Sequence, residues 1–141
     1  MILSDDRERG GGVMAAPAAV LVLALVLCLG LGIDGVRKAQ LLASVTATAE
    51  EAARAGGQEV DTVALRRGVV AIDVDRAQAA ALDHLAEAGV TGTVVVVDGA
   101  VRVEATAARP TVFLGLLGID EVTAEGFGEA QPIVVASGGA G

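Results

Sequence analysis

The feature that most constrains this chain is a stretch without any charged residue, Gly10–Ile33. Its 24 residues would span about 36 Å as an α-helix, which is more than the roughly 30 Å hydrocarbon core of a bilayer. Backbone groups in lipid must bond within their own segment, so membrane insertion would impose a helix. Pro17 falls in the first turns, where a missing N–H costs least. We therefore predict one transmembrane helix over residues 13–33.

Two other interpretations of this stretch are weaker. A cleaved signal peptide has an apolar core of about 7–15 residues and a small-residue cleavage site, whereas this run is longer and continues into Asp34, Gly35, Val36 and Arg37. A lipoprotein signal would need a small residue before Cys28, and Leu27 stands there. We expect Cys28 to be a small apolar residue within a retained helix.

The orientation of the helix does not follow from its flanking charges. Arg7 and Arg9 lie on the amino side, and Arg37 and Lys38 lie on the carboxyl side. Lys and Arg near the ends of a span set its direction. The count is equal, so this rule favours neither direction.

Composition limits what the rest of the chain can be. The 141 residues give room for one small domain and an anchor, and 53% are apolar but only 1% aromatic. A core without large rings must consist of Val, Leu, Ile and Ala, which disfavours an enzyme with a deep pocket. The net charge of −8 argues against nucleic-acid binding. One Cys and one His exclude disulfides within the chain and metal sites rich in Cys or His.

The helical pattern continues beyond the apolar run. Apolar residues recur at steps of three to five, and Gly56-Gly57 provides a stop, so we predict a stalk helix over 34–56. Its Ala-rich surface could pack against a neighbouring helix of another protein or against the chain's own head, and the sequence does not decide between these. The stripe consists of Ile33, Val36, Leu41, Val45, Ala49 and Ala52.

A connection and a second helix follow. Residues 57–68 are polar, and Val69–Ile72 is short and apolar, so we expect a connection and then a strand. Asp73 suits an N-cap for a helix over 75–88, which Gly89 would end. His84 falls beside the apolar face of that helix and is expected to be an ordinary helix residue. The expected face consists of Ala77, Ala81, Leu82, Leu85 and Ala88.

The clearest local pattern is a hairpin. Asp98-Gly99 separates two runs rich in Val, 93–97 and 100–106, which is typical of a type I′ turn. A two-residue turn pairs Val96 with Val101 and Val94 with Val103. These side chains share one apolar face, and Arg102 and Glu104 point to the other, opposite Val95 and Thr93.

The last third of the chain predicts one more helix and one more strand. Arg109-Pro110 should end the second strand, and Thr111–Ile119 reads as a short apolar helix under the sheet that ends near Gly118. An alternative is a turn with buried leucines. Residues 121–129 alternate with a period of two and predict a third strand, in which Gly126 and Gly128 mark a close approach or a bulge.

Together these elements predict an α+β protein: a transmembrane helix, a stalk helix, and a small head with a three-stranded, mainly antiparallel sheet. With about 75 residues the head would be only marginally stable, so we expect the stalk helix to supply part of its core. The expected segments are a tail (1–12), a transmembrane helix (13–33), a stalk (34–56), a connection (57–68), a head (69–135) and a disordered end (136–141).

No pattern in the sequence predicts catalysis. No phosphate-binding glycine motif is present, and no serine stands in a nucleophile context. The sequence has two acid pairs, Asp73 with Asp75 and Asp120 with Glu121. Because no further oxygen ligands stand near them, we expect them in helix caps and turns and not in a Ca²⁺ site. We therefore predict no catalytic, cofactor-binding or metal-binding residues and no cofactor.

Three stretches resemble proteins of one family. They are the entry Arg9-Gly10-Gly11-Gly12, the exit 32–37 (Gly-Ile-Asp-Gly-Val-Arg) that runs into the Ala-rich segment 47–55, and the tail 101–126. In the tail, Val-Arg-Val-Glu-Ala-Thr leads through Arg-Pro-Thr to Leu-Gly-Leu-Leu-Gly-Ile and Val-Thr-Ala-Glu-Gly. In order and spacing they resemble the TadE/TadG-like proteins of tight-adherence (Tad, Flp-type) pilus systems, especially actinobacterial members, over most of residues 7–130.

The resemblance implies a pseudopilin-like, single-pass protein of the cell membrane that takes part in pilus assembly or a related secretion apparatus. It implies a cytoplasmic amino terminus and an extracytoplasmic head. Members cut by prepilin peptidase carry a Glu early in the mature apolar segment, and no Glu occurs in 10–33. The resemblance is therefore closer to the uncleaved, TadG-like members.

Three functions are compatible with these features. The first is a non-enzymatic assembly component whose partners are the bilayer and other pilus-assembly membrane proteins, contacted by helix packing. The alternative is a membrane-tethered extracytoplasmic binding module or adhesin, although the head has no cluster of the aromatic residues that anchor interfaces. An enzyme ranks last. Neither nucleic acid nor a small-molecule substrate is expected as a partner.

Overall fold

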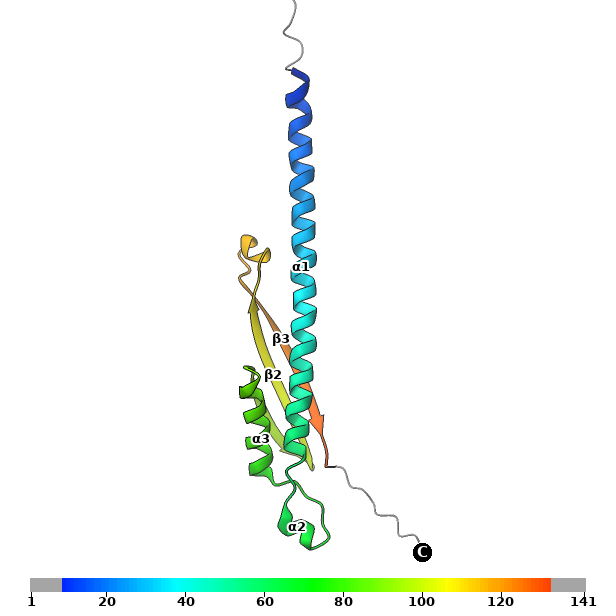
Figure 1. Cartoon of the computed structure of the whole chain (residues 1–141), viewed down its shortest axis with the longest axis vertical. Coiled ribbons are helices and arrows are strands. Elements are labelled where there is room, and N and C mark those ends of the chain that lie inside the picture. The colour runs from blue at the N-terminus through cyan, green and yellow to red at the C-terminus, as the bar shows by residue number, and fades with distance from the viewer. Residues whose placement is uncertain (1–8, 133–141) are drawn as a thin grey trace, which may run out of the picture. The chain divides into compact units, whose positions relative to one another are not determined.

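The computed structural model describes residues 9–132, with side chains from Ala15 onward. It has the predicted α+β architecture of a long amino-terminal helix and a three-stranded antiparallel sheet (Figure 1). The expected frayed end and most of the amino-terminal tail lie outside the described residues. The elements are α1 (Arg9–Gly57), α2 (Thr62–Arg66), α3 (Val74–Glu87), β1 (Thr91–Val97), β2 (Ala100–Pro110), the 3₁₀ helix η1 (Leu114–Leu117) and β3 (Glu121–Ala130).

Helix α1 contains the uncharged segment and continues without a break to Gly57, where the glycine pair was expected to end it. It is long and apolar enough to cross a membrane, with a mean hydropathy of 2.6 over 18 residues. Most of the large apolar side chains between Val20 and Ile33 are exposed in the isolated chain. Soluble proteins do not normally expose so continuous an apolar surface. This surface is what a lipid-facing helix requires.

The chain forms two compact units. The first combines the helix up to Arg37 with the segment Pro110–Glu121. The second combines Lys38–Arg109 with the chain from Val122 onward, and it holds the sheet, α2 and α3. Each unit therefore contains a part of α1 together with residues from much later in the sequence.

The hairpin has the predicted turn and register. Asp98 and Gly99 both have positive φ, 54° and 75°, as a type I′ turn requires. Val96 pairs with Val101, and Val94 pairs with Val103. The sheet order is β1-β2-β3, so β2 is the central strand. It ends at Pro110, where the Arg109-Pro110 pair was expected to end it.

The second unit has its core between the sheet and two helices. The carboxyl-terminal part of α1 packs on the chain's own head, which was one of the two alternatives for the stalk helix. The stalk therefore supplies core residues, as expected. Here β3 crosses α1 at Gly126 and Gly128, where a Cβ would collide with the backbone of Thr46 and Ala49, respectively. The core side chains from α1 are Leu41, Val45, Ala49, Ala52 and Ala53.

Helix α3 begins as predicted, with the Asp73 carboxylate accepting a hydrogen bond from the Arg76 N–H at 3.2 Å. Gly89 follows its end with a φ of +68°. Of the expected apolar face, Ala77, Ala81 and Leu85 are buried. The prediction was wrong for Leu82 and Ala88, which are exposed.

The predicted strand Val69–Ile72 does not form. Only Ile72 makes a β-bridge, with Val60, and residues 69–71 are irregular. The expected connection before it contains the one-turn helix α2, whose cap Asp61 accepts hydrogen bonds from the Val63 and Ala64 N–H groups. The chain thus turns back on itself at α2, and the two arms meet at a single bridge instead of a ladder.

The segment Thr111–Ile119 forms a short helix, but its leucines are not buried under the sheet. Residues 114–117 are a 3₁₀ turn ended by Gly118 with a φ of +82°. Leu116 and Leu117 are 79% and 63% exposed. The prediction of burial was wrong because this segment belongs to the first unit, where its hydrogen-bonding partner is α1.

Candidate functional site

The most unusual side chain in the described part of the chain is Asp34, the first residue after the predicted membrane segment. It is 3% exposed and is the one buried charged residue among those described. Its two carboxylate oxygens accept hydrogen bonds from three consecutive backbone N–H groups, those of Val112 (3.2 Å), Phe113 (2.9 Å) and Leu114 (2.8 Å). A buried charge needs such partners, because an unpaired one would be strongly destabilising.

These hydrogen bonds hold the pKa of Asp34 below the ordinary value for an aspartate. The N–H of Leu114 has the largest effect, the N–H groups of Val112 and Phe113 add to it, and the nearby Arg37 adds a smaller favourable charge. Burial acts in the opposite direction and is outweighed. Asp34 is therefore ionised at neutral pH, and it acts as a cap on the turn that leads into η1.

Phe113 brings the same loop into contact with α1 one turn earlier. A Cβ on Gly30 would lie 2.6 Å from Cγ of the Phe113 ring, so the ring rests where only a glycine leaves space. Thr111 closes the base of the loop, since its N–H donates to the Asp120 carbonyl (3.0 Å) and its hydroxyl donates to the Ile119 carbonyl. The segment 111–120 is thus a closed loop fixed against residues 30–34 of α1.

This arrangement suits a structural role better than a catalytic one. An ionised carboxylate whose oxygens accept three N–H groups has no proton to donate at neutral pH. What it can do is fix the position of an apolar loop beside the end of the apolar helix. We refer to Asp34 with the N–H groups of residues 112–114 as the Asp34 cap.

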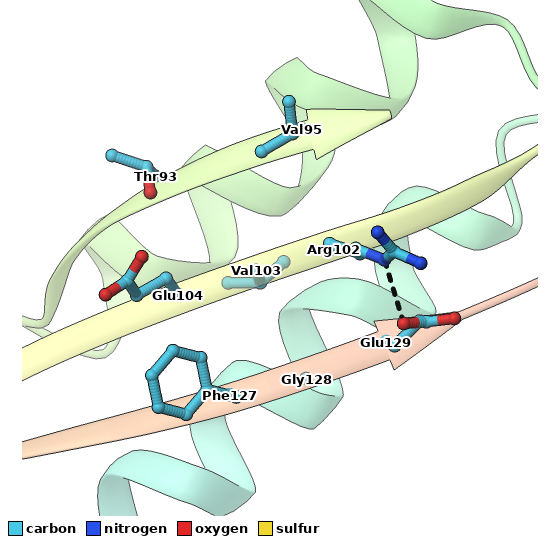
Figure 2. A pocket seen from close by; sticks show the side chains of 8 residues that line it. All are labelled: Thr93, Val95, Arg102, Val103, Glu104, Phe127, Gly128 and Glu129. Atoms are coloured by element: carbon cyan, nitrogen blue, oxygen red, sulfur yellow. Dashed lines mark hydrogen bonds and ion pairs between the residues drawn. The ribbon is translucent and has the colours of Figure 1, made fainter. Parts of the chain in front are cut away.

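A second candidate surface is the outer face of the sheet. Figure 2 shows it with α1 and α3 behind the strands and with side chains of all three strands on the near side. The predicted cross-strand pairs are present, Thr93 opposite Glu104 and Val95 opposite Arg102. From β3, Phe127 stands on this face with 61% of its surface exposed.

A shallow hollow of about 440 Å³ lies on this face. Arg102 crosses from β2 to β3 and bonds Glu129 at 2.9 Å, which closes one end of the hollow (Figure 2). An exposed pair of this kind adds little to stability. It places two opposite charges on the same face as the apolar side chains of Val95 and Phe127.

Asp73 and His84, which were named above from the sequence, have ordinary structural roles. Asp73 caps α3. His84 lies on α3 with its Nε2 atom 3.4 Å from a carboxylate oxygen of Glu51 on α1. Between residues 15 and 132, no three His, Cys, Asp or Glu side chains come together in a way that could hold a metal ion. The expectation of no catalytic or cofactor-binding residue stays a prediction.

The role of Asp34 was not predicted, although its sequence position carried a signal. It is an acid inside a helix with a small residue, Gly35, after it, directly behind an apolar run. It also belongs to one of the stretches on which the family resemblance rests, and its partners belong to another. Comparison of the chain with models of protein families, with curated proteins and with solved structures gives no match.

Proposed function

We propose that this chain is a membrane-anchored, non-enzymatic accessory component of a Tad/Flp-type pilus assembly or of a related secretion machine. In this proposal residues 13–33 span the cell membrane once, the amino terminus is cytoplasmic and the head is extracytoplasmic. Its partners are the lipid bilayer and other membrane proteins of the assembly, contacted through helix packing.

The observation that carries the proposal is that the two parts of α1 differ in their surroundings. Its first part is uncharged and exposes its apolar side chains, as a segment in lipid does. Its last part contributes fully buried residues to the core of the second unit, among them Ala49, Ala52 and Ala53. A single helix that serves as both anchor and core fits a protein whose task is to hold a small domain at a membrane.

The Asp34 cap is compatible with the proposed family. The exit motif 32–37 and the tail motif 109–119 are more than 70 residues apart in the sequence. They meet in the first unit through the three hydrogen bonds of Asp34. Two of the stretches on which the resemblance depends thus form one structural feature, as expected if they belong to a common architecture.

The alternative function, a membrane-tethered binding module or adhesin, is favoured by a different observation. The outer sheet face exposes Phe127 and Val95 beside the Arg102–Glu129 ion pair, and aromatic side chains with Arg are common in binding surfaces. The two functions differ in where the partner is. An assembly component contacts membrane proteins of its own cell, whereas an adhesin binds an external ligand through the head.

A genetic experiment with a crosslinking arm separates them. The gene is deleted in a host that makes Tad-type pili, and surface fibres are counted by electron microscopy with and without complementation. We expect fibres to be lost on deletion, to return with the full chain, and a crosslinker in intact membranes to capture the pilus platform proteins. Normal fibre numbers, with no platform protein captured, would contradict the assembly role and favour the adhesin.

A further inference from the structure

The apolar loop after β2 has no explanation in the proposed assembly role. Residues 110–119 contain no charged side chain. Four of their large apolar side chains are about half or more exposed: Val112, Leu116, Leu117 and Ile119. A loop would normally present polar residues to water, and four exposed aliphatic side chains within eight positions are unfavourable in that setting.

The place of this loop is fixed by contacts within the first unit. Asp34, directly after the predicted membrane segment, binds the N–H groups of residues 112–114, and Phe113 rests on Gly30 inside that segment. Figure 1 shows the turn beside α1. The exposed leucines therefore lie alongside the carboxyl end of the segment that crosses the bilayer.

We propose that residues 112–119 enter the bilayer together with the end of the transmembrane helix, so that Leu116 and Leu117 lie among lipid acyl chains at the outer interface. This rests on the membrane anchor of the proposed function and adds a second lipid contact to it. Leu29, Leu31 and Ile33 are also exposed, and they lie on the same turns of α1 as Gly30 and Asp34, which contact the loop.

Six backbone N–H groups of the loop have partners within the chain, as lipid requires of polar backbone groups. The N–H groups of residues 112–114 are bonded by Asp34, and those of Leu116, Gly118 and Ile119 are bonded to carbonyls of the loop itself. Unbonded backbone groups are too costly for a loop in hydrocarbon. The Asp34 carboxylate thus provides acceptors for N–H groups of the loop, as backbone carbonyls do within a helix.

Depth-dependent fluorescence quenching tests this in the full chain. Cys28→Ala removes the native thiol, and single cysteines at Leu116, Leu117, Leu23 and Leu65 are labelled with an environment-sensitive dye. The variants are reconstituted into vesicles of phosphatidylethanolamine and phosphatidylglycerol at low protein density. Leu23 lies within the span and reports on the anchor. Leu65 on α2 is an exposed leucine of the second unit and serves as the matched control.

We expect a dye at 116 or 117 to emit at shorter wavelength than one at 65 and to be quenched by lipids that carry a spin label near the headgroup. Iodide in the water should quench it less than the dye at 65. Adding Asp34→Ala should release the loop and weaken lipid quenching at 116 while leaving that at 23 unchanged.

Three results would overturn the proposal. Lipid quenching at 23 combined with iodide quenching at 116 and 117 equal to that at 65 would refute the loop insertion and leave the anchor standing. Protection at 116 and 117 from both lipid and water quenchers would mean that protein covers the loop, such as a second copy of the chain. Absence of lipid quenching at 23 would refute the anchor and the loop insertion together.

Discussion

At the scale of single residues, Asp34 joins two distant parts of the chain by charge. Its folded-state pKa is lowered by the N–H groups it binds. A group with a lowered folded pKa stabilises the fold fully above its unfolded pKa, about 3.9 for aspartate. That contribution decreases as the pH falls below this value and is lost below the folded pKa.

The first prediction concerns this pH dependence. We expect hydrogen exchange of the amides at residues 112–114, corrected for the intrinsic pH dependence of exchange, to be slow at neutral pH. The same amides should lose protection as the pH falls below about 4. Asp34→Asn should lower the protection at neutral pH and abolish its change with pH, as measured by mass spectrometry of the full chain in detergent micelles. Protection in the Asn variant that matches the native chain at every pH would show that the charge has no role.

The second prediction uses two glycines of α1. Gly30→Ala places a methyl group 2.6 Å from Cγ of Phe113, whereas Gly32→Ala meets no atom within 4 Å. Gly to Ala normally favours a helix by about 1 kcal/mol, so Gly32→Ala should leave the fold intact or stabilise it slightly. We expect Gly30→Ala to displace the ring and to raise the exchange rates of residues 112–114. Equal exchange in the two variants would contradict the packing of Phe113 on Gly30.

At the scale of elements, the backbone of β3 approaches that of α1 closely at Gly128. Gly128→Ala would place a methyl group on the Ala49 carbonyl, and neither backbone can move without separating strand and helix. We expect a loss of about 1–3 kcal/mol in the free energy of unfolding, measured by chemical denaturation of the full chain in micelles.

The matched control for this change is Thr123→Ala, at an exposed position of the same strand. Its cost should reflect β-propensity alone, about 1 kcal/mol or less. A Gly128→Ala variant as stable as Thr123→Ala would show that β3 does not approach the helix as closely as described.

The elements also show what the sequence could and could not predict. The turn and the register of the hairpin were predicted to the residue, because the Asp98-Gly99 turn fixes the register locally. The end of α1 and the start of α3 were predicted because Gly57 and Asp73 act within one turn of the chain. The loop 111–119 was misjudged because its partner, Asp34, is 78 positions away from Val112 and no local pattern indicates it.

The outer face of the sheet was also predicted only in its local features. Alternation along β2 predicted that Arg102 and Glu104 point away from the core, and the structure confirms it. The ion pair with Glu129 was not predicted, because it depends on how β3 is placed beside β2. Cross-strand contacts between strands far apart in the sequence need the tertiary fold.

At the scale of the whole molecule, both proposed membrane contacts depend on the anchor. A bilayer around the uncharged segment of α1 would cover the exposed apolar side chains between Val20 and Ile33 and the exposed leucines of the loop 111–119. In the proposed anchor, the Asp34 cap lies at the boundary of the membrane. Without lipid, the first unit would expose most of its large apolar residues to water, which folded soluble chains avoid.

The most direct test is extraction of the full-length chain from purified envelopes with alkaline carbonate. Carbonate removes proteins held at a membrane by charge or by other proteins and leaves those that span it. We predict that the chain stays in the membrane pellet and becomes soluble only with detergent. An intact chain in the carbonate supernatant, with a known spanning protein retained in the same pellet, would contradict the anchor and every role built on it.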